Sequence, residues 1–236
     1  MLAFRRLRDL RLAIVVPTLN EEGTLRHILP TVLPLADEVV VSDGGSTDRT
    51  VEVARELGAR VVTGSPGRGG QLTRGAAAAT EADILLFLHA DTLPPPDAAR
   101  LVRAAVAAGA VGGGFRVRFD DGRRLLRLGE WLIDLRTSLT RLPLGDQAQF
   151  VTREAFDTLG GYRDWPILED LDFAWRMQRR WGRRRLAIID EKVTTAARRF
   201  VEQGVVRTVA TNWLIWLLFG FGVSPHRLAR LYRHIR

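Results

Sequence analysis

Glu38-Val39-Val40-Val41-Ser42-Asp43-Gly44-Gly45-Ser46-Thr47-Asp48 is the stretch that decides the fold of this chain. Its β-branched residues at 39–41 predict a buried strand, and the two glycines that follow allow a tight turn. Ser, Thr and Asp are residue types that cap helices, so a helix is predicted to begin at position 47 or 48. Because strands of an open α/β sheet direct their carboxyl ends towards the ligand crevice, Asp43 is predicted to contact a ligand rather than only to shape the turn.

The first hundred residues alternate between strand and helix patterns. Apolar runs predict further strands at residues 12–16, 60–63 and 84–88, and helical spacings lie between them, including an alanine-rich segment at residues 71–79. Such alternation predicts an α/β fold with a mostly parallel, Rossmann-like sheet flanked by helices.

The second half of the chain has a different pattern. Residues 111–120 alternate as a strand, residues 125–140 and 169–181 have helical patterns, and residues 145–151 look extended. A largely apolar segment at residues 205–221 is interrupted by Arg207 and Asn212, so it is too polar to span a bilayer. It predicts a helical C-terminal extension that packs on the core, with a helix lying on a membrane surface as the alternative.

Composition limits the classes of function. The chain has 236 residues, 46% of them hydrophobic, which is enough for a full core. It contains no cysteine, which excludes thiol chemistry and cysteine metal sites and suits a cytoplasmic location, as does the lack of an apolar signal-peptide core. A net charge of +8 favours anionic partners: a phosphorylated small molecule, an anionic bilayer or nucleic acid.

Four segments follow predicted strands and should meet at one crevice: residues 17–21, 43–45, 67–70 and 89–91. Backbone amides and Arg68 would suit phosphates, and polar side chains would suit a base and ribose. Asp91 would offer a carboxylate to Mg²⁺ or Mn²⁺, whose shell substrate phosphates can complete.

The order of these segments resembles the family 2 nucleotide-diphosphate-sugar glycosyltransferases, which have the GT-A fold. The resemblance rests on residues 15–22, on residues 41–50, on Leu88-His89-Ala90-Asp91 in the place of an Asp-x-Asp metal motif, and on Leu168-Glu169-Asp170-Leu171-Asp172 in the place of an acidic acceptor-side motif. More narrowly, the chain resembles a small bacterial subgroup linked to arsenosugar biosynthesis.

The resemblance implies roles for particular residues. Asp43 would bind the nucleotide base, Arg68 the phosphates, and Asp91 the metal, which is Mn²⁺ or Mg²⁺. Asp170 would be the general base that deprotonates the acceptor hydroxyl, and Glu169 would support it. The remaining nucleotide contacts implied are Pro17, Thr18, Asn20, Glu21, Gly44 and Ala90.

His89 departs from the family motif, which has an aspartate at that position. A neutral imidazole ligates Mn²⁺ but suits Mg²⁺ poorly, so His89 is either a second metal ligand or a residue that orients the site.

Weaker expectations concern the acceptor and the diphosphate. Asp146 and Gln147 would line the acceptor site, with an ordinary turn as the alternative. Arg198 and Arg199 would clamp the diphosphate, with a solvated basic surface as the alternative. Trp165 would stack on a sugar ring or fill the core.

The sequence and the resemblance together predict an inverting glycosyltransferase with an unknown acceptor and no nucleic acid partner; a UDP-sugar is the favoured donor, and a GDP-sugar is the alternative. Its expected organisation is a nucleotide-sugar half at 1–110, an acceptor and catalytic half at 111–200, and the helical extension at 201–236. It is expected in the cytoplasm, and peripheral contact with the inner face of the membrane is left open as the alternative to packing of the C-terminal helix on the core. The alternatives are a nucleotidyltransferase and a basic adaptor for anionic lipid or RNA. A nicotinamide oxidoreductase is disfavoured because the first strand–helix turn lacks the Gly-x-Gly-x-x-Gly pattern.

Overall fold

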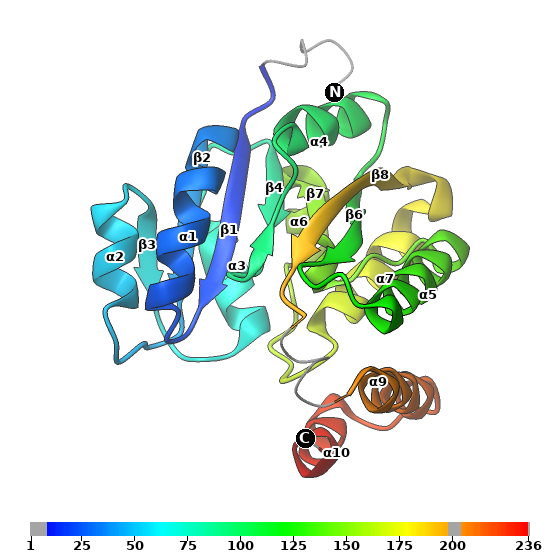
Figure 1. The fold of residues 1–236 in the computed structure, drawn as a ribbon. Coiled ribbons are helices and arrows are strands. Elements are labelled where there is room, and N and C mark those ends of the chain that lie inside the picture. Colours follow the sequence, from blue (N-terminus) through cyan, green and yellow to red (C-terminus); the bar gives the residue numbers. More distant parts are fainter. Residues whose placement is uncertain (1–8, 198–203, 236) are drawn as a thin grey trace.

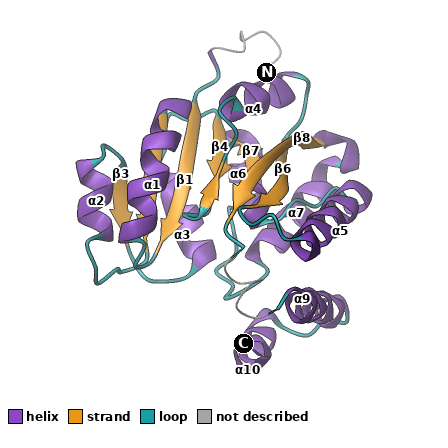
Figure 2. Cartoon of the chain, in the orientation of Figure 1, coloured by secondary structure: helices purple, strands orange, loops and turns teal. Residues whose placement is uncertain are grey.

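One mixed sheet of eight strands carries the chain, and helices cover both of its faces (Figures 1 and 2). The structure is a computed structural model that describes residues 9–197 and 204–235. The strand order is β3-β2-β1-β4-β7-β6-β8-β5. The strands are β1 (Leu12–Thr18), β2 (Glu38–Asp43), β3 (Arg60–Thr63), β4 (Ile84–Phe87), β5 (Thr92–Leu93), β6 (Gly112–Phe119), β7 (Phe150–Thr152) and β8 (Leu186–Thr195).

The pairing separates the sheet into a parallel part and a mixed part. Strands β1 to β4 pair in parallel, as the alternating pattern predicts. Strand β7 then runs antiparallel to both β4 and β6, whereas β6 and β8 are parallel to each other. The predicted α/β class with a GT-A-type sheet is confirmed; β5 and β8 are strands that the sequence patterns did not reveal.

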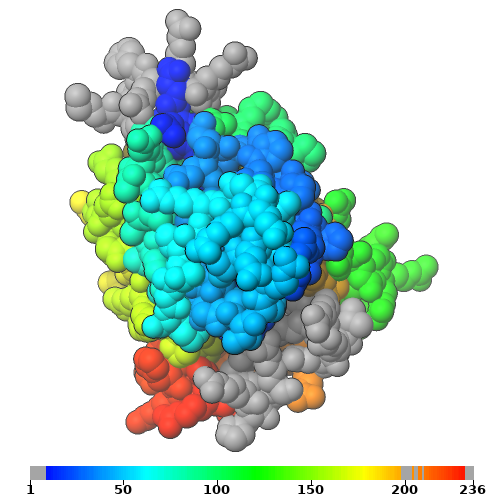
Figure 3. Space-filling model, turned by 90° about the vertical axis from the view of Figure 1, so that its left-hand side faces the viewer, coloured from blue at the N-terminus to red at the C-terminus, as the bar shows by residue number. Residues whose placement is uncertain are grey.

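The helices form a layer on each face. They are α1 (Glu22–Val32), α2 (Thr50–Glu56), α3 (Arg68–Ala78), α4 (Ala98–Ala107), α5 (Arg124–Thr140), α6 (Arg153–Leu159), α7 (Glu169–Trp181), α9 (Val205–Gly220) and α10 (Pro225–Ile235). Side chains of α1, α2, α4 and α5 join one apolar core, and side chains of α3, α6, α7 and α9 join the other. Figure 3 shows the side of the molecule that the first helices cover, with α10 in red at its lower edge.

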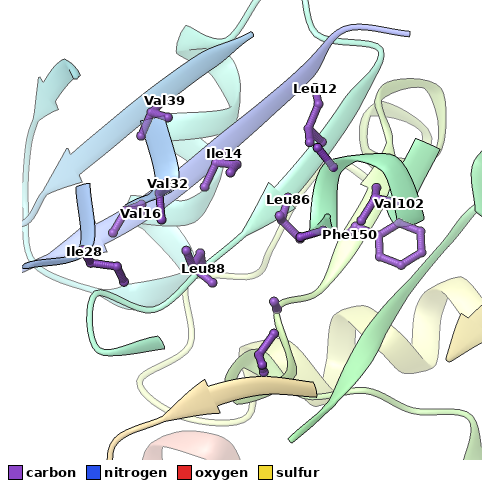
Figure 4. Close-up of a cluster of buried hydrophobic side chains, with 14 of the residues drawn as sticks. Leu12, Ile14, Val16, Ile28, Val32, Val39, Leu86, Leu88, Val102 and Phe150 are labelled. Atoms are coloured by element: carbon purple, nitrogen blue, oxygen red, sulfur yellow. The ribbon is translucent and has the colours of Figure 1, made fainter. Parts of the chain in front are cut away.

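Strand β1 shows why two cores form. Leu12, Ile14 and Val16 point into the core of α1 and α4, where Figure 4 shows them beside Leu86 and Val102. Ala13 and Val15, the residues between them, point into the opposite core. Alternate side chains of a strand face opposite sides of a sheet, so a strand that is apolar throughout must be covered on both faces.

Several boundaries differ from the predictions. Helix α2 begins at Thr50 rather than at 47 or 48, because Asp48 accepts a hydrogen bond from the Thr50 amide just before the helix. Helix α3 begins at Arg68, so the glycines at 69 and 70 lie in its first turn. Residues 145–147 form a 3₁₀ turn rather than extended chain.

The C-terminal segment is helical, as predicted. No helix in the described part of the chain is both long and apolar enough to cross a membrane. The division of the chain at residues 110 and 200 stays a prediction.

Candidate active site

The carboxyl ends of β1, β2 and β4 form one edge of the sheet, as the parallel registers require. Thr18 lies beside Asp43 in the register of β1 and β2, and Pro17 lies beside Ser42. Ala90 is buried just beyond β4. The predicted nucleotide contacts Pro17, Thr18, Asp43 and Ala90 are therefore brought to the same edge of the sheet.

The turns after β1 and β2 are held together by side chains. The amide of Asn20 donates to Ser46 Oγ over 2.8 Å, and the amide of Thr47 donates to Asn20 Oδ1 over 2.8 Å. Asn20 adopts a left-handed backbone with φ of 56°, which asparagine tolerates better than most residues. Glu21 adds a further contact between the segments that follow β1 and β2, because its backbone amide donates a hydrogen bond to Thr50 Oγ1. Asn20 and Glu21 thus build the turn that a nucleotide would meet.

The carboxylate of Asp43 shapes its own turn. It accepts hydrogen bonds from the amides of Gly45 and Ser46 over 2.8 and 2.9 Å, and from the hydroxyls of Ser46 and Thr18. The residue is only 1% exposed. Both carboxylate oxygens of Asp43 are therefore used by the turn, and a contact between Asp43 and a nucleotide base stays a prediction.

Gln71 is a site residue that the sequence analysis missed. Its amide nitrogen donates to the carbonyl oxygens of Thr18 and Ser42, over 2.8 and 3.0 Å, and so joins the ends of β1 and β2. Gly44 permits this, since a Cβ on Gly44 would lie 2.9 Å from the Gln71 amide nitrogen. A glutamine inside an alanine-rich helix gives no sequence signal of such a contact.

Arg68 connects the two halves of the site. Its guanidinium lies 3.4 Å from Glu169 Oε1, at the first residue of α7. The positive charge of Arg68 also acts on the carboxylates of Asp170, Asp146 and Asp91. An exposed cation from α3 therefore faces four carboxylates, three of which come from the second half of the chain.

The first turn of α7 carries three acidic residues, of which Glu169 and Asp170 lie in different environments. Glu169 is 2% exposed, and burial together with the charge of Asp170 raises its pKa to about 7, against the opposing effect of Arg68. Asp170 accepts hydrogen bonds from the amides of Leu171 and Gly145, over 2.7 and 2.8 Å. These amides fix the direction of the Asp170 carboxylate and stabilise its negative charge.

Gln149 supports this turn and was also missed. Its side-chain nitrogen donates to the carbonyl of Asp170 over 3.0 Å, and its side-chain oxygen accepts from the Tyr162 hydroxyl over 2.8 Å. Asp172 has a different use, because it accepts from Arg176 Nε over 2.7 Å and pairs with Arg163. The carboxylate of Asp172 therefore contributes to the fold, because ion pairs with Arg176 and Arg163 engage it.

His89 and Asp170 approach each other at Gly145. A Cβ on Gly145 would lie 2.7 Å from His89 Nε2 and 3.2 Å from Asp170 Oδ2. Loss of water around His89, and secondarily the charge of Arg68, lowers the pKa of the imidazole to about 3. His89 is therefore neutral at physiological pH, and one ring nitrogen keeps a free lone pair.

Asp91 remains exposed after the end of β4. The protein around it removes part of its water and raises the pKa of its carboxyl group. Within residues 9–197 and 204–235, no group of three His, Asp or Glu side chains is placed to hold a metal ion. Asp91 and His89 could together supply one carboxylate oxygen and one neutral nitrogen, a donor set that leaves most of the coordination shell to other groups.

Gln147 and Asp146, the two predicted acceptor residues of the 3₁₀ turn, lie in different environments. Gln147 is completely buried; its amide donates to the carbonyl of Phe115 and its oxygen accepts from Arg136 and Leu144. It therefore braces the 3₁₀ turn, as the alternative interpretation has it, and an acceptor contact of Gln147 stays a prediction. Its neighbour Asp146 has a raised pKa because burial outweighs the charge of Arg136, and its Oδ1 is buried without a hydrogen bond.

Trp165 packs against the C-terminal extension. Its ring meets Phe219 edge-on at 5.9 Å, and the Arg163 guanidinium lies 5.0 Å from its centre. This contact favours the packing interpretation of Trp165 over sugar stacking. Arg198 and Arg199, the predicted diphosphate clamp, lie outside the described residues.

Comparison with known sequences supports the family expectation. The profile of Glycosyl transferase family 2 matches residues 13–160. Glucosyl-3-phosphoglycerate synthase of Mycobacterium tuberculosis (strain ATCC 25618 / H37Rv) is 38% identical over 97 residues, 36% of this chain and 30% of that protein. Succinoglycan biosynthesis protein ExoA of Rhizobium meliloti is 48% identical over 48 residues, 19% of this chain and 14% of that protein. The aligned stretches thus cover less than a third of these relatives.

Solved structures have the same fold. The M. tuberculosis synthase in complex with uridine-diphosphate matches 78% of this chain and 71% of its own, with 25% identity and a TM-score of 0.62. The same synthase with Mn²⁺ and uridine-diphosphate-glucose matches with 26% identity and a TM-score of 0.59, over 78% of this chain and 70% of that one. The link to arsenosugar biosynthesis stays a prediction. Since the family profile covers more than half of the chain, including all four segments at the crevice, the chain belongs to glycosyl transferase family 2.

Proposed function

We propose that this chain transfers a sugar from a nucleoside diphosphate sugar to an acceptor hydroxyl, with inversion at the anomeric carbon. The observation that carries the proposal is the meeting of His89 with Asp170 at Gly145. It sets the carboxylate of α7 against the end of β4, where a donor diphosphate would lie. Family membership supports the same reaction class.

The donor is proposed to be a UDP-sugar. Support comes from the M. tuberculosis synthase, whose structures contain uridine-diphosphate and uridine-diphosphate-glucose. The base and ribose would lie along Pro17, Thr18, Asn20, Glu21 and Gly44, with Asp43 holding the turn. The exposed guanidinium of Arg68 would face the diphosphate, since guanidinium groups match phosphate oxygens in geometry and charge.

A divalent cation is proposed as the cofactor. The donor set fits one, because the Asp91 carboxylate is exposed and the His89 imidazole is neutral with a free lone pair. When bound, the cation would stabilise the negative charge on the departing diphosphate. The nitrogen donor favours Mn²⁺ over Mg²⁺, and Mn²⁺ is the ion in the structure of the relative.

Asp170 is proposed as the general base. The acceptor oxygen forms a bond to the anomeric carbon as the bond to the diphosphate breaks, the electron pair leaves with the nucleoside diphosphate, and the acceptor proton passes to Asp170. A positioned base contributes about 10²–10⁴-fold to the rate. Glu169, which pairs with Arg68, would help place the acceptor or hold Asp170.

The acceptor side is proposed to include Asp146, whose buried Oδ1 has no protein partner in the described part of the chain. Arg198 and Arg199 remain a proposed diphosphate clamp. A cytoplasmic location also remains a proposal. The family match favours the transferase over the nucleotidyltransferase and over the basic adaptor.

Calorimetric titration tests the donor site. UDP and GDP would be added to the wild type, with and without Mn²⁺, and to Asp91→Ala and Asp97→Ala. Asp97 lies at the start of α4, paired with Arg100 and remote from the crevice, so it controls for the loss of a carboxylate. We expect Mn²⁺-dependent binding of UDP that is lost in Asp91→Ala and kept in Asp97→Ala. If no nucleotide binds, the transferase proposal is wrong.

A further inference from the structure

The exposed apolar side chains of this protein are concentrated on three helices. Thirteen large apolar side chains are exposed in the described part of the chain, and ten of them lie on α5, on α10, or on α9 and the residue after it. They are Leu125, Leu128, Trp131, Leu135, Leu139, Trp213, Leu214, Leu217, Phe221 and Leu231. An apolar concentration of this kind on one part of a surface marks an interaction site.

On α5 these residues form a stripe opposite the core. Leu128, Trp131 and Leu135 recur at intervals of three and four, so they share one side of the helix. Leu126 and Thr137 are buried on the other side. Trp131 is 58% exposed and Leu139 is 65% exposed, although a surface helix ordinarily presents polar residues outward. The side of α5 that faces away from the core is therefore largely apolar.

Helix α9 lies next to α5 and continues the surface. The Arg136 guanidinium of α5 lies 5.1 Å from the ring centre of Trp216 in α9, which identifies the sides that face each other. Leu135 and Leu217 are the neighbours of these residues in sequence, so each lies about 100° around its helix from the contact. Figure 1 shows α5 and α9 as neighbouring helices, so that these exposed leucines can contribute to one surface.

The exposed charged side chains of α5, α9 and α10 are basic. Arg124, Arg127, Arg227 and Arg230 are exposed beside the apolar residues. Helices α9 and α10 contain no acidic residue. The two acidic residues of α5 are Glu130, which is buried, and Asp134, which lies 3.6 Å from Lys192.

We infer that α5, α9 and α10 form a surface that binds an anionic lipid bilayer. Tryptophan and leucine side chains would enter the interface between headgroups and acyl chains, and the arginines would meet the lipid phosphates. A second copy of this chain fits less well, because a two-fold interface would bring two arginine-bearing faces together, and α9 and α10 have no acidic residue to pair with those arginines. The inference extends the predicted contact by the C-terminal segment to α5, and it does not depend on the proposed reaction.

Vesicle sedimentation tests the inference. The full chain would be mixed with vesicles of phosphatidylcholine alone and with vesicles containing phosphatidylglycerol. We expect binding that needs the anionic lipid and weakens with salt. Arg124→Gln with Arg127→Gln should reduce the partition coefficient about ten-fold or more. Trp131→Ser with Leu135→Ser should reduce it by a similar factor.

Two controls keep the outcome decisive. Arg26→Gln with Arg100→Gln removes the same charge from exposed positions on α1 and α4 and should leave binding unchanged. Circular dichroism and UDP titration verify that each variant is folded. Equal loss of binding in this control, or no preference for anionic vesicles, would overturn the inference. So would a dimer in solution that Trp131→Ser with Leu135→Ser converts to monomer, because the surface would then belong to a second copy.

Discussion

The Nε2 atom of His89 and the Oδ2 atom of Asp170 both lie close to the position that a Cβ atom of residue 145 would occupy. The distances from that position are 2.7 Å to Nε2 and 3.2 Å to Oδ2. One group comes from the end of β4 and the other from the first turn of α7. The amide of Gly145 also donates to Asp170. Glycine at 145 is therefore what lets the two halves of the proposed active site approach each other.

Gly145→Ala should reduce turnover by about 100-fold, because displacing a reacting group by about 1 Å has an effect of this size. The added methyl group would push His89 and Asp170 apart. The release of UDP from a UDP-sugar measures the loss. Gly122→Ala is the matched control, since a Cβ at that position meets nothing within 4 Å. Equal activity of the two variants would mean that this approach has no part in catalysis.

Asp170→Asn should lower kcat by about 10²–10⁴-fold, because the amide cannot accept the acceptor proton. Donor affinity should stay near the wild-type value, since in our proposal Asp170 acts on the acceptor. Steady-state kinetics and UDP titration separate the two effects. If donor binding is lost while turnover of bound donor is normal, Asp170 is a donor contact and not the base.

Asp172→Asn should act on stability instead. Asp172 is buried and pairs with Arg176 and Arg163, so its loss leaves a partly buried guanidinium without its carboxylate. The free energy of unfolding should fall by about 3 kcal/mol, measured in urea. Asp190→Asn, which breaks the exposed pair with Arg116, should change it by less than about 1 kcal/mol. A similar effect of both would contradict this role of Asp172.

Glu169 should make stability depend on pH. Its pKa rises from an ordinary value of 4.5 to about 7 in the folded protein, so the folded state holds a proton that the unfolded state releases. The contribution of Glu169 to stability is therefore most favourable below pH 4.5 and declines as the pH rises to 7. Glu169→Gln should remove this decline when unfolding in urea is measured from pH 5 to pH 8. Glu52→Gln, on an exposed residue, should keep the wild-type slope. An identical slope in Glu169→Gln would contradict the raised pKa.

The first half of the fold could be predicted because each buried parallel strand there is a continuous apolar run, as in Ile84 to Phe87 of β4. Strand β8 escaped detection because Asp190, Glu191 and Lys192 interrupt its apolar pattern at an exposed stretch. Its pairing with β6 is also displaced between Phe115 and Arg116. Such a strand depends on partners that are remote in sequence.

The candidate site, like the fold, could be predicted from the sequence only in part. Asp43, Asp91 and Asp170 could be found because they lie at the end of a strand, in the segment after a strand and in the first turn of a helix, respectively. The contacts of these carboxylates could not be predicted. For example, the hydrogen bonds that Asp43 accepts from the amides of Gly45 and Ser46 depend on the conformation of the turn. Gln71, Gln147 and Gln149 bind backbone carbonyls through their amides, and no spacing in the sequence marks those contacts.

Gln71 has a consequence for how the donor would bind. Its amide holds the ends of β1 and β2 through Thr18 and Ser42, and Asn20 joins the turns beyond them. The loss of conformational entropy in these turns therefore accompanies folding and not the arrival of a ligand. The nucleotide half of the crevice would receive its donor as a rigid surface, and any ordering on binding would fall on the acceptor side.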